Sequence, residues 1–118
     1  IDLNEPGTYY NSENLPENKY FFDIGMQSII ELNNIMQDYD IIFWNGTLGV
    51  VENELYSYGS RTLLELLIKS GKKVIVGGGD TACFVNKYSH NFYYVSTGGG
   101  ASIDYISSGS LAGMNYFL

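Results

Sequence analysis

Three short apolar runs, each ended by glycine, constrain the fold of this chain more than any other feature. Their sequences are DIIFWNG at residues 40–46, KKVIVGGG at residues 72–79 and FYYVSTGGG at residues 92–100. The runs are apolar throughout rather than alternating, which is typical of strands buried on both faces. A segment with helical spacing follows each run. The pattern predicts strand–turn–helix units, and therefore an α/β fold with a doubly wound, Rossmann-like parallel sheet and helices on both faces.

The spacing of apolar residues also gives approximate bounds. We expect strands at residues 40–44, 73–77 and 92–96, and helices at residues 23–38, 60–71, 80–89 and 101–109. Asp23 or Gly25 is the expected start of the first helix. Ser60 is expected to N-cap the second helix, and Gly71 to end it. Residues 1–19 hold both prolines, so they predict an irregular connecting segment with at most a short edge strand.

The composition excludes several classes of protein. At 118 residues, with 45% hydrophobic and 16% charged residues, the chain fits one globular domain rather than a disordered segment. A formal net charge of −7 argues against a nucleic-acid partner, because there is no basic stripe to neutralise phosphates. No apolar run reaches membrane-spanning length, so we expect no membrane partner. The single cysteine, Cys83, and the lack of a secretory signal favour a cytoplasmic location.

Three parallel strands make a small sheet. Sheets of this kind usually contain more strands, because both faces and both edges must be covered. The first residue is Ile1 rather than Met. We therefore expect residues 1–118 to be an incomplete domain from a longer chain.

The turns after the three strands are the expected ligand site. In open parallel sheets, ligands bind outside the carboxyl ends of the strands. The turns WNGTLG, GGGDT and TGGGAS all follow strands and so fall on that rim. A glycine run at the start of a helix exposes N–H groups at the positive end of the helix dipole, which is a phosphate site. Two such loops side by side would flank a polyphosphate or a phosphoryl group in transit.

Asp80 follows the first glycine run directly. A carboxylate at a phosphate-binding helix start repels the ligand unless a divalent cation lies between them. Mg²⁺ held by a carboxylate and phosphate oxygens is the usual arrangement. The alternative is that Asp80 simply caps its helix, and base rates for Asp at helix starts favour the cap when this residue is considered alone.

A dinucleotide-binding fingerprint is the rival interpretation of the first glycine run. GGGDTA matches the pattern G-x-G-x-x-A. That fingerprint expects an acidic residue about 20 positions on, at the end of the next strand. Here the next strand ends near Ser96, and Asp104 lies inside the following predicted helix. The match is therefore weak, and a G-x-x-x-x-G-K-[ST] phosphate loop is absent from the sequence.

The motifs WNGTLGVVE, VIVGGGDTA and VSTGGGAS resemble, in order and spacing, the C-terminal half of phosphoglycerate kinases. Members of that family carry WNGP-x-G-x-x-E, then GGGDT, then STGGGAS. The segments LPENKYFFDIG and LAGMNYF extend the resemblance to about residues 15–117. Three motifs in register are far more specific than one glycine run.

The resemblance implies roles for four residues around the nucleoside and its phosphates. Asn45 matches the family asparagine beside the nucleotide phosphates. Phe22 and Val50 match residues that line the adenine pocket. Glu52 matches the glutamate that accepts hydrogen bonds from the ribose hydroxyls.

The resemblance also assigns the two glycine loops. The phosphate and metal loop of the family matches Gly78, Gly79, Asp80 and Thr81. The second loop, whose amides face the transferring phosphoryl group, matches Gly98, Gly99 and Gly100. The implied catalytic amides are those of Gly78, Gly79, Gly99 and Gly100. With the resemblance, Mg²⁺ coordination becomes the better interpretation of Asp80.

The family reaction is reversible phosphoryl transfer between 1,3-bisphosphoglycerate and MgADP, which gives 3-phosphoglycerate and MgATP in glycolysis. Positioning and charge neutralisation supply most of the catalysis in such a transfer. This chain lacks the N-terminal domain with which the family holds phosphoglycerate, so we expect the isolated fragment to be inactive. The alternatives are a truncated nucleotide-binding module without turnover and, with less support, a dinucleotide-dependent oxidoreductase.

Some residues depart from the family pattern. Thr47 replaces the family proline, and Phe21 and Met26 stand where the family usually has glycine and proline. A bulky Phe21 is expected to affect the shape of the adenine pocket. Two other residues have default structural interpretations: Cys83 as a small buried hydrophobe, and Trp44 packed beneath the ligand rim.

Overall fold

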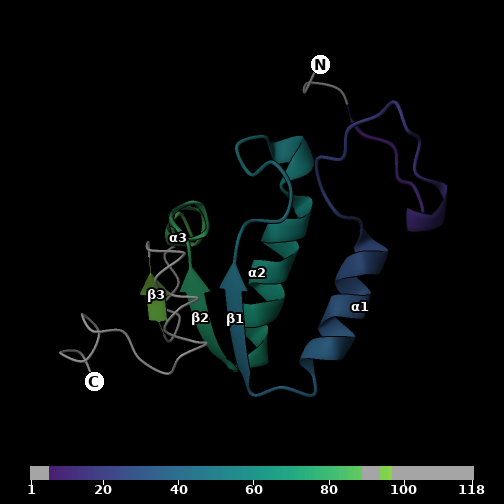
Figure 1. The fold of residues 1–118 in the computed structure, drawn as a ribbon. Helices are drawn as coiled ribbons and strands as arrows, with labels where there is room; N and C mark the ends of the chain where they lie inside the picture. The colour runs from purple at the N-terminus through teal and green to yellow at the C-terminus, as the bar shows by residue number, and fades with distance from the viewer. Residues whose placement is uncertain (1–5, 89–93, 97–118) are drawn as a thin grey trace, which may run out of the picture. The chain divides into compact units, whose positions relative to one another are not determined.

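The structure is a computed structural model of the chain and describes residues 6–88 and 94–96. It divides into two compact units, which are described separately. The helical unit consists of Ile1–Asp38 and Thr47–Ser70. The sheet unit consists of Tyr39–Gly46 and Gly71–Leu118. Figure 1 shows the helices and strands of both units.

The sheet unit contains three parallel strands in the order β1 (Ile41–Asn45), β2 (Lys73–Gly77) and β3 (Tyr94–Ser96). The register places Asn45 opposite Gly77, and Gly77 opposite Ser96. The carboxyl ends of the strands therefore meet at one edge of the sheet (Figure 1). The predicted α/β fold with a parallel sheet is confirmed, and the predicted strands agree with the observed ones within two residues.

Helix α3 (Gly79–Asn86) follows β2 after a single residue, Gly78. Gly78 has a φ of +92°, a conformation that glycine adopts without the strain that a Cβ would impose. The chain therefore leaves the sheet in one sharp step and enters the helix. The prediction of a helix from residue 80 was right about its start within one residue, but α3 ends earlier than predicted.

The core of the sheet unit lies between β2 and α3. Val74, Val76 and Val85 are almost fully buried. The Trp44 ring meets the Phe84 ring edge-on, with centroids 6.3 Å apart. Trp44 also donates a hydrogen bond of 2.7 Å from Nε1 to the carbonyl oxygen of Gly46. Trp44 thus packs beneath the turn that follows β1, as predicted.

Cys83 corrects one prediction. We expected a small buried hydrophobe, but this side chain is exposed on α3. Its neighbours Ala82 and Phe84 are buried, as are Thr81 and Val85. Four of the eight helix residues already supply the buried face, so position 83 falls on the opposite face.

The helical unit contains α1 (Met26–Met36) and α2 (Tyr58–Ser70), which lie side by side (Figure 1), and the short 3-10 turns η1 (Ser12–Asn14) and η2 (Glu54–Tyr56). Of the two predicted starts for the first helix, Gly25 is the N-cap. Residues 6–19 are mostly exposed and contain η1 but no strand, so the short edge strand is not found among them.

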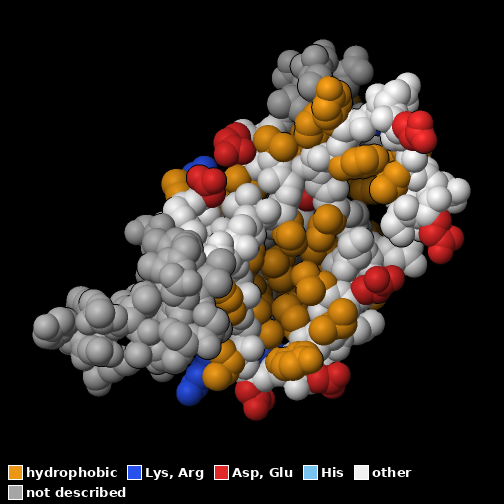
Figure 2. All heavy atoms as spheres, viewed as in Figure 1, with side chains coloured by type: hydrophobic (Ala, Val, Ile, Leu, Met, Phe, Trp, Pro, Cys, Tyr) orange, Lys and Arg blue, Asp and Glu red, His pale blue; other side chains and the backbone are white. Residues whose placement is uncertain are grey.

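Apolar side chains remain at the surface of the helical unit (Figure 2). Met26, Ile30 and Ile35 of α1 are all more than half exposed. Ile29 and Met36, on another face of the same helix, are buried. None of the helices among the described residues has the length and apolarity needed to cross a membrane.

Ser60 corrects a second prediction. We expected it to N-cap the second helix, but α2 begins at Tyr58 and Ser60 lies within the first turn. The Ser60 hydroxyl donates a hydrogen bond of 2.6 Å to the Leu48 carbonyl oxygen and accepts one of 2.7 Å from the Leu48 N–H. The Ser60 side chain therefore hydrogen-bonds to the loop at Leu48 instead of capping α2. The predicted stop is confirmed, since Gly71 follows α2 with a φ of +67°.

Candidate functional site

The sheet unit places Asn45 against the first glycine loop at the carboxyl ends of β1 and β2. Asn45 and Gly77 are register partners. A Cβ on Gly77 would lie 3.2 Å from Asn45 Nδ2, and a Cβ on Gly78 would lie 3.0 Å from Asn45 Oδ1. Side chains at positions 77 and 78 would therefore crowd the Asn45 amide. The absence of side chains at these two glycines allows Asn45 to lie against the loop backbone.

Thr81 ties the turn after β1 to the first turn of α3. The Gly46 N–H donates a hydrogen bond of 2.8 Å to Thr81 Oγ1. The Thr81 side chain is only 1% exposed. The resemblance placed Thr81 in the phosphate and metal loop. In the structure its hydroxyl is bonded to the backbone of the neighbouring turn, so it fixes the position of Gly46 relative to α3.

The start of α3 presents backbone N–H groups that no described residue accepts. The Gly78 carbonyl accepts a hydrogen bond of 2.9 Å from the Ala82 N–H, which closes the first helical turn. The N–H groups of Gly79, Asp80 and Thr81 precede that bond and have no acceptor within the helix. Gly79 and Asp80 are exposed. Their position suits an anion, since the helix dipole is positive at this end.

The Asp80 side chain is exposed at the second position of α3. The N-cap of this helix is Gly78, and no side chain makes a capping hydrogen bond there. The capping alternative is therefore wrong for this residue. Among the residues described, no group of three His, Cys, Asp or Glu side chains gathers to hold a metal ion. A single exposed carboxylate, close in sequence to N–H groups that have no acceptor within the helix, nevertheless fits Mg²⁺ shared with phosphate oxygens.

The helical unit brings together the two residues expected to line the adenine pocket. The Val50 N–H donates a hydrogen bond of 2.8 Å to the Phe22 carbonyl oxygen. The Phe22 ring lies 5.1 Å from the Tyr56 ring and 6.2 Å from the Tyr20 ring, measured between centroids. Glu52, the expected ribose acceptor, is exposed two residues after Val50.

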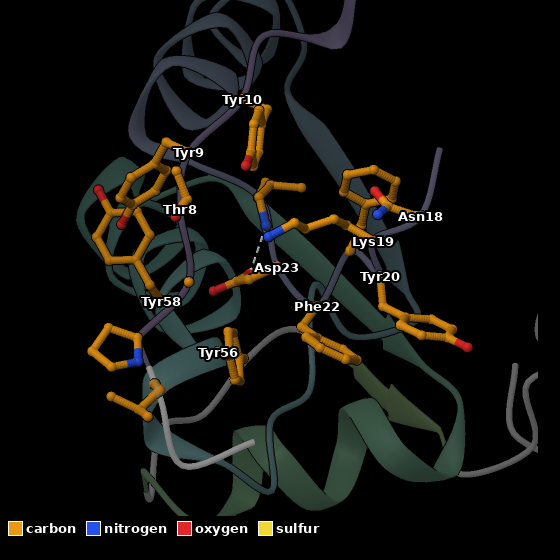
Figure 3. A pocket seen from close by; sticks show the side chains of 15 residues that line it. Thr8, Tyr9, Tyr10, Asn18, Lys19, Tyr20, Phe22, Asp23, Tyr56 and Tyr58 are labelled. Atoms are coloured by element: carbon orange, nitrogen blue, oxygen red, sulfur yellow. Dashed lines mark hydrogen bonds between the residues drawn. The ribbon is translucent and has the colours of Figure 1, made fainter. Parts of the chain in front are cut away.

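A pocket of about 590 Å³ opens in the helical unit beside Phe22 (Figure 3). Much of its lining is aromatic, from Tyr9, Tyr10, Tyr20, Phe21, Phe22, Tyr56 and Tyr58. Phe21 lines the pocket with a side chain that is 57% exposed. Val50 and Glu52 are not among the lining residues. The pocket therefore contains one of the three predicted nucleoside contacts.

Asp23 is the residue that sequence reasoning missed. We expected it, or Gly25, to start the first helix. Instead its carboxylate accepts hydrogen bonds from the Gly59 N–H, at 3.0 Å to Oδ2 and 3.2 Å to Oδ1. One signal was available: α2 has no acidic residue in its own first turn. The N-terminus of a helix carries partial positive charge, so a carboxylate from elsewhere in the chain is favourable where the first turn has none of its own.

The remaining predicted site residues lie outside the described residues. Gly98, Gly99 and Gly100 belong to this group, as does the predicted helix at residues 101–109. The placement of the second glycine loop stays a prediction. Of the others, Asn45, Gly78, Gly79, Asp80 and Thr81 belong to the sheet unit, whereas Phe22, Val50 and Glu52 belong to the helical unit.

Comparison with known proteins decides the family. Residues 2–109 match the family model described as phosphoglycerate kinase. The chain belongs to the phosphoglycerate kinase family. This membership confirms the resemblance and favours the kinase interpretation over the dinucleotide-dependent oxidoreductase.

Two bacterial phosphoglycerate kinases illustrate the similarity in sequence. The protein of Borreliella burgdorferi is 40% identical over 108 residues, which cover 90% of this chain and 28% of the relative. The protein of Borreliella afzelii is 38% identical over 117 residues, which cover 96% of this chain and 30% of the relative. The chain thus spans less than a third of the length of these phosphoglycerate kinases.

Solved phosphoglycerate kinases share the fold. The structure from Coxiella burnetii matches with a TM-score of 0.75 and 35% identity, over 86% of this chain and 27% of that one. The structure from Pyrococcus horikoshii OT3 matches with a TM-score of 0.63 and 28% identity, over 74% of this chain and 22% of that one. Both are similar to this chain over most of its length.

Proposed function

We propose that the protein containing this chain catalyses reversible phosphoryl transfer between 1,3-bisphosphoglycerate and MgADP, giving 3-phosphoglycerate and MgATP. Family membership supplies the reaction class. One structural observation supports it most directly: α3 begins with two exposed residues, Gly79 and Asp80, and no side chain caps its start. This is a suitable arrangement for a nucleotide phosphate with a bridging cation.

The amides of Gly78 and Gly79 bind phosphate oxygens in this proposal. Neither glycine has a side chain of its own to shield its N–H group, and the space beside Gly78 is taken by the Asn45 amide. The α3 dipole adds a favourable potential for negative charge. Donors fixed in advance at the site of developing charge stabilise the transition state without reorganising during the reaction. We assign the same role to Gly98, Gly99 and Gly100, whose amides would face the transferring phosphoryl group.

Asp80 is the proposed Mg²⁺ ligand. When bound, the ion neutralises phosphate charge during transfer. The chain places the Asp80 carboxylate in the first turn of α3, where it makes no capping hydrogen bond. Asn45 then lies beside the phosphates, and Thr81 keeps the Gly46 turn against α3.

In this proposal the nucleoside contacts residues of the helical unit. Phe22 supplies an aromatic face for adenine, and Val50, joined to it by a backbone hydrogen bond, supplies an apolar contact. Glu52 accepts hydrogen bonds from the ribose hydroxyls through an exposed carboxylate. We propose that the remainder of the full-length protein holds phosphoglycerate. This chain covers 28% of the relative from Borreliella burgdorferi. We also propose that the enzyme acts in glycolysis in the cytoplasm.

An assay of the full-length protein tests the proposal. Purified protein supplied with 1,3-bisphosphoglycerate and MgADP should form ATP, and residues 1–118 alone should form none. A truncated nucleotide-binding module without turnover is the second candidate. Binding of MgADP by the full-length protein without ATP formation would favour that module. Binding of NAD in place of MgADP would favour the oxidoreductase.

A further inference from the structure

We infer that Asp23 is a positioning residue for nucleotide binding: its carboxylate sets the spacing between the segment that carries Phe22 and the segment that carries Val50. The inference rests on the proposed function, because it assumes that these two segments contact the nucleotide. Asp23 itself has no proposed contact with the substrate.

Backbone hydrogen bonds converge on the Asp23 carboxylate. Oδ1 accepts from the Ile24 N–H at 2.8 Å, a bond that is drawn in Figure 3. Both oxygens accept from the Gly59 N–H, across 36 positions of sequence. Hydrogen bonds to an ionised carboxylate are roughly twice as strong as neutral ones. The carboxylate therefore ties the Phe22 segment to the start of α2.

Two glycines enclose the same carboxylate. A Cβ on Gly59 would lie 2.5 Å from Asp23 Oδ1 and 2.8 Å from Ile24 Cγ1. A Cβ on Gly49 would lie 2.5 Å from Asp23 Oδ1 and would also collide with the carbonyl oxygen of Tyr56. Both backbones are thus in close contact with the carboxylate. Asp23 lies where three segments meet, at residues 22–25, 48–50 and 56–60.

The geometry extends from Asp23 to the residues proposed to contact the nucleotide. Phe22 precedes Asp23, and Val50 follows Gly49. The 2.8 Å hydrogen bond between the Val50 N–H and the Phe22 carbonyl oxygen closes the link between the two segments. Ser60 holds the second segment from its other end through its two bonds to Leu48. A shift of the carboxylate would therefore change the separation of Phe22 and Val50.

The substitution Asp23→Asn in the full-length protein tests the inference. It keeps the size of the side chain but replaces one acceptor oxygen with an amino group, which cannot accept from Gly59. We expect the KM for MgADP and its Kd to rise about tenfold, the effect of losing one charge-assisted hydrogen bond. The kcat and the KM for 1,3-bisphosphoglycerate should stay within about twofold. Asp38→Asn, at an exposed carboxylate just after α1, is the matched control and should change none of these values.

Several outcomes would overturn the inference. A purely structural role predicts a lower Tm with an unchanged KM for MgADP, or equal increases in both KM values. If the Asp23→Asn variant binds MgADP as tightly as the wild-type protein does, the inference is refuted but the proposed function is not. Wild-type protein that binds no MgADP would refute the proposed function itself, and the inference with it.

A measurement on the wild-type protein covers the case in which Asp23→Asn does not fold. The amide hydrogens of Gly59 and Val50 donate the bonds that define this junction. Their exchange should be slow in the free protein and slower when MgADP is bound, because the nucleotide stabilises the closed spacing. Unprotected Gly59, or protection that MgADP leaves unchanged, would contradict a positioning role.

Discussion

The backbone N–H of Gly46 donates a 2.8 Å hydrogen bond to the hydroxyl of Thr81, across 35 positions of sequence. The bond joins the turn after β1 to the first turn of α3. Both segments lie at the edge of the sheet where the proposed phosphate site is located, so the position of Asn45 beside that site depends on this contact. The Thr81 side chain is nearly inaccessible, which makes its hydroxyl costly to replace.

Thr81→Val should destabilise the protein because it leaves the Gly46 N–H without its acceptor while keeping the size of the side chain. The expected loss is about 0.5–1.5 kcal/mol, the net contribution of one hydrogen bond, because Gly46 is exposed and its N–H can bond to water in the variant. Thermal and denaturant unfolding of the full-length protein would measure it. Thr81→Ser retains the hydroxyl and serves as the control. Equal stability of the Val and Ser variants would show that the hydrogen bond contributes little.

Asp80→Ala should weaken the binding of MgADP much more than it weakens folding. The carboxylate is exposed and does not cap α3, so its removal costs little stability. Loss of a Mg²⁺ ligand should lower affinity about tenfold, or 1.4 kcal/mol. Calorimetric titration with MgADP, and with ADP in the presence of a chelator, separates the metal effect from the nucleotide effect. If the variant loses affinity for ADP equally with and without Mg²⁺, Asp80 is not the metal ligand.

The strands and the turns after them were predictable because their causes are local. Apolar runs ended by glycine mark β1 and β2, and the glycine run before Asp80 marks the start of α3. Asn45 was assigned to the rim for the same reason. These features depend on neighbours a few residues apart in the sequence.

Ser60 was interpreted wrongly and the role of Asp23 was missed because the partners of both side chains are distant in the sequence. Each looked like a helix-start residue, and neither serves as the N-cap of the helix it was expected to start. Ser60 binds the backbone of Leu48, and Asp23 binds that of Gly59. A side-chain acceptor near a helix start has several possible partners, and the tertiary fold selects among them. The exposure of Cys83 has a related cause, since the helix phase that decides it depends on packing against the sheet.

Gly78→Ala should reduce both stability and nucleotide affinity. Residue 78 has a φ of +92°, and an added Cβ would lie 3.0 Å from Asn45 Oδ1. The backbone strain should cost about 1–2 kcal/mol, and displacement of Asn45 should weaken MgADP binding. Gly71→Ala is a matched control: its φ is +67°, but nothing lies within 4 Å of the added Cβ. That variant should lose similar stability and keep its affinity. Equal affinity losses in the two variants would show that strain alone is responsible.

Phe22→Ala should weaken nucleotide binding through loss of an aromatic face. The Phe22 ring is held by its contacts with Tyr56 and Tyr20 and lines the pocket of the helical unit. Stacking of a base on an aromatic side chain is worth about 1–3 kcal/mol, so the Kd for MgADP should rise by a factor of about 5 or more.

Phe22→Leu and Tyr39→Ala separate stacking from general damage to the fold. Phe22→Leu keeps an apolar side chain without the aromatic face, so it should recover stability more fully than affinity. Tyr39→Ala removes an exposed aromatic ring elsewhere in the chain and should leave the Kd unchanged. Isothermal titration with MgADP and with magnesium pyrophosphate, which lacks a base, completes the test. Phe22→Ala should weaken binding of the nucleotide alone; equal weakening for pyrophosphate would place the effect at the phosphate site instead of the base.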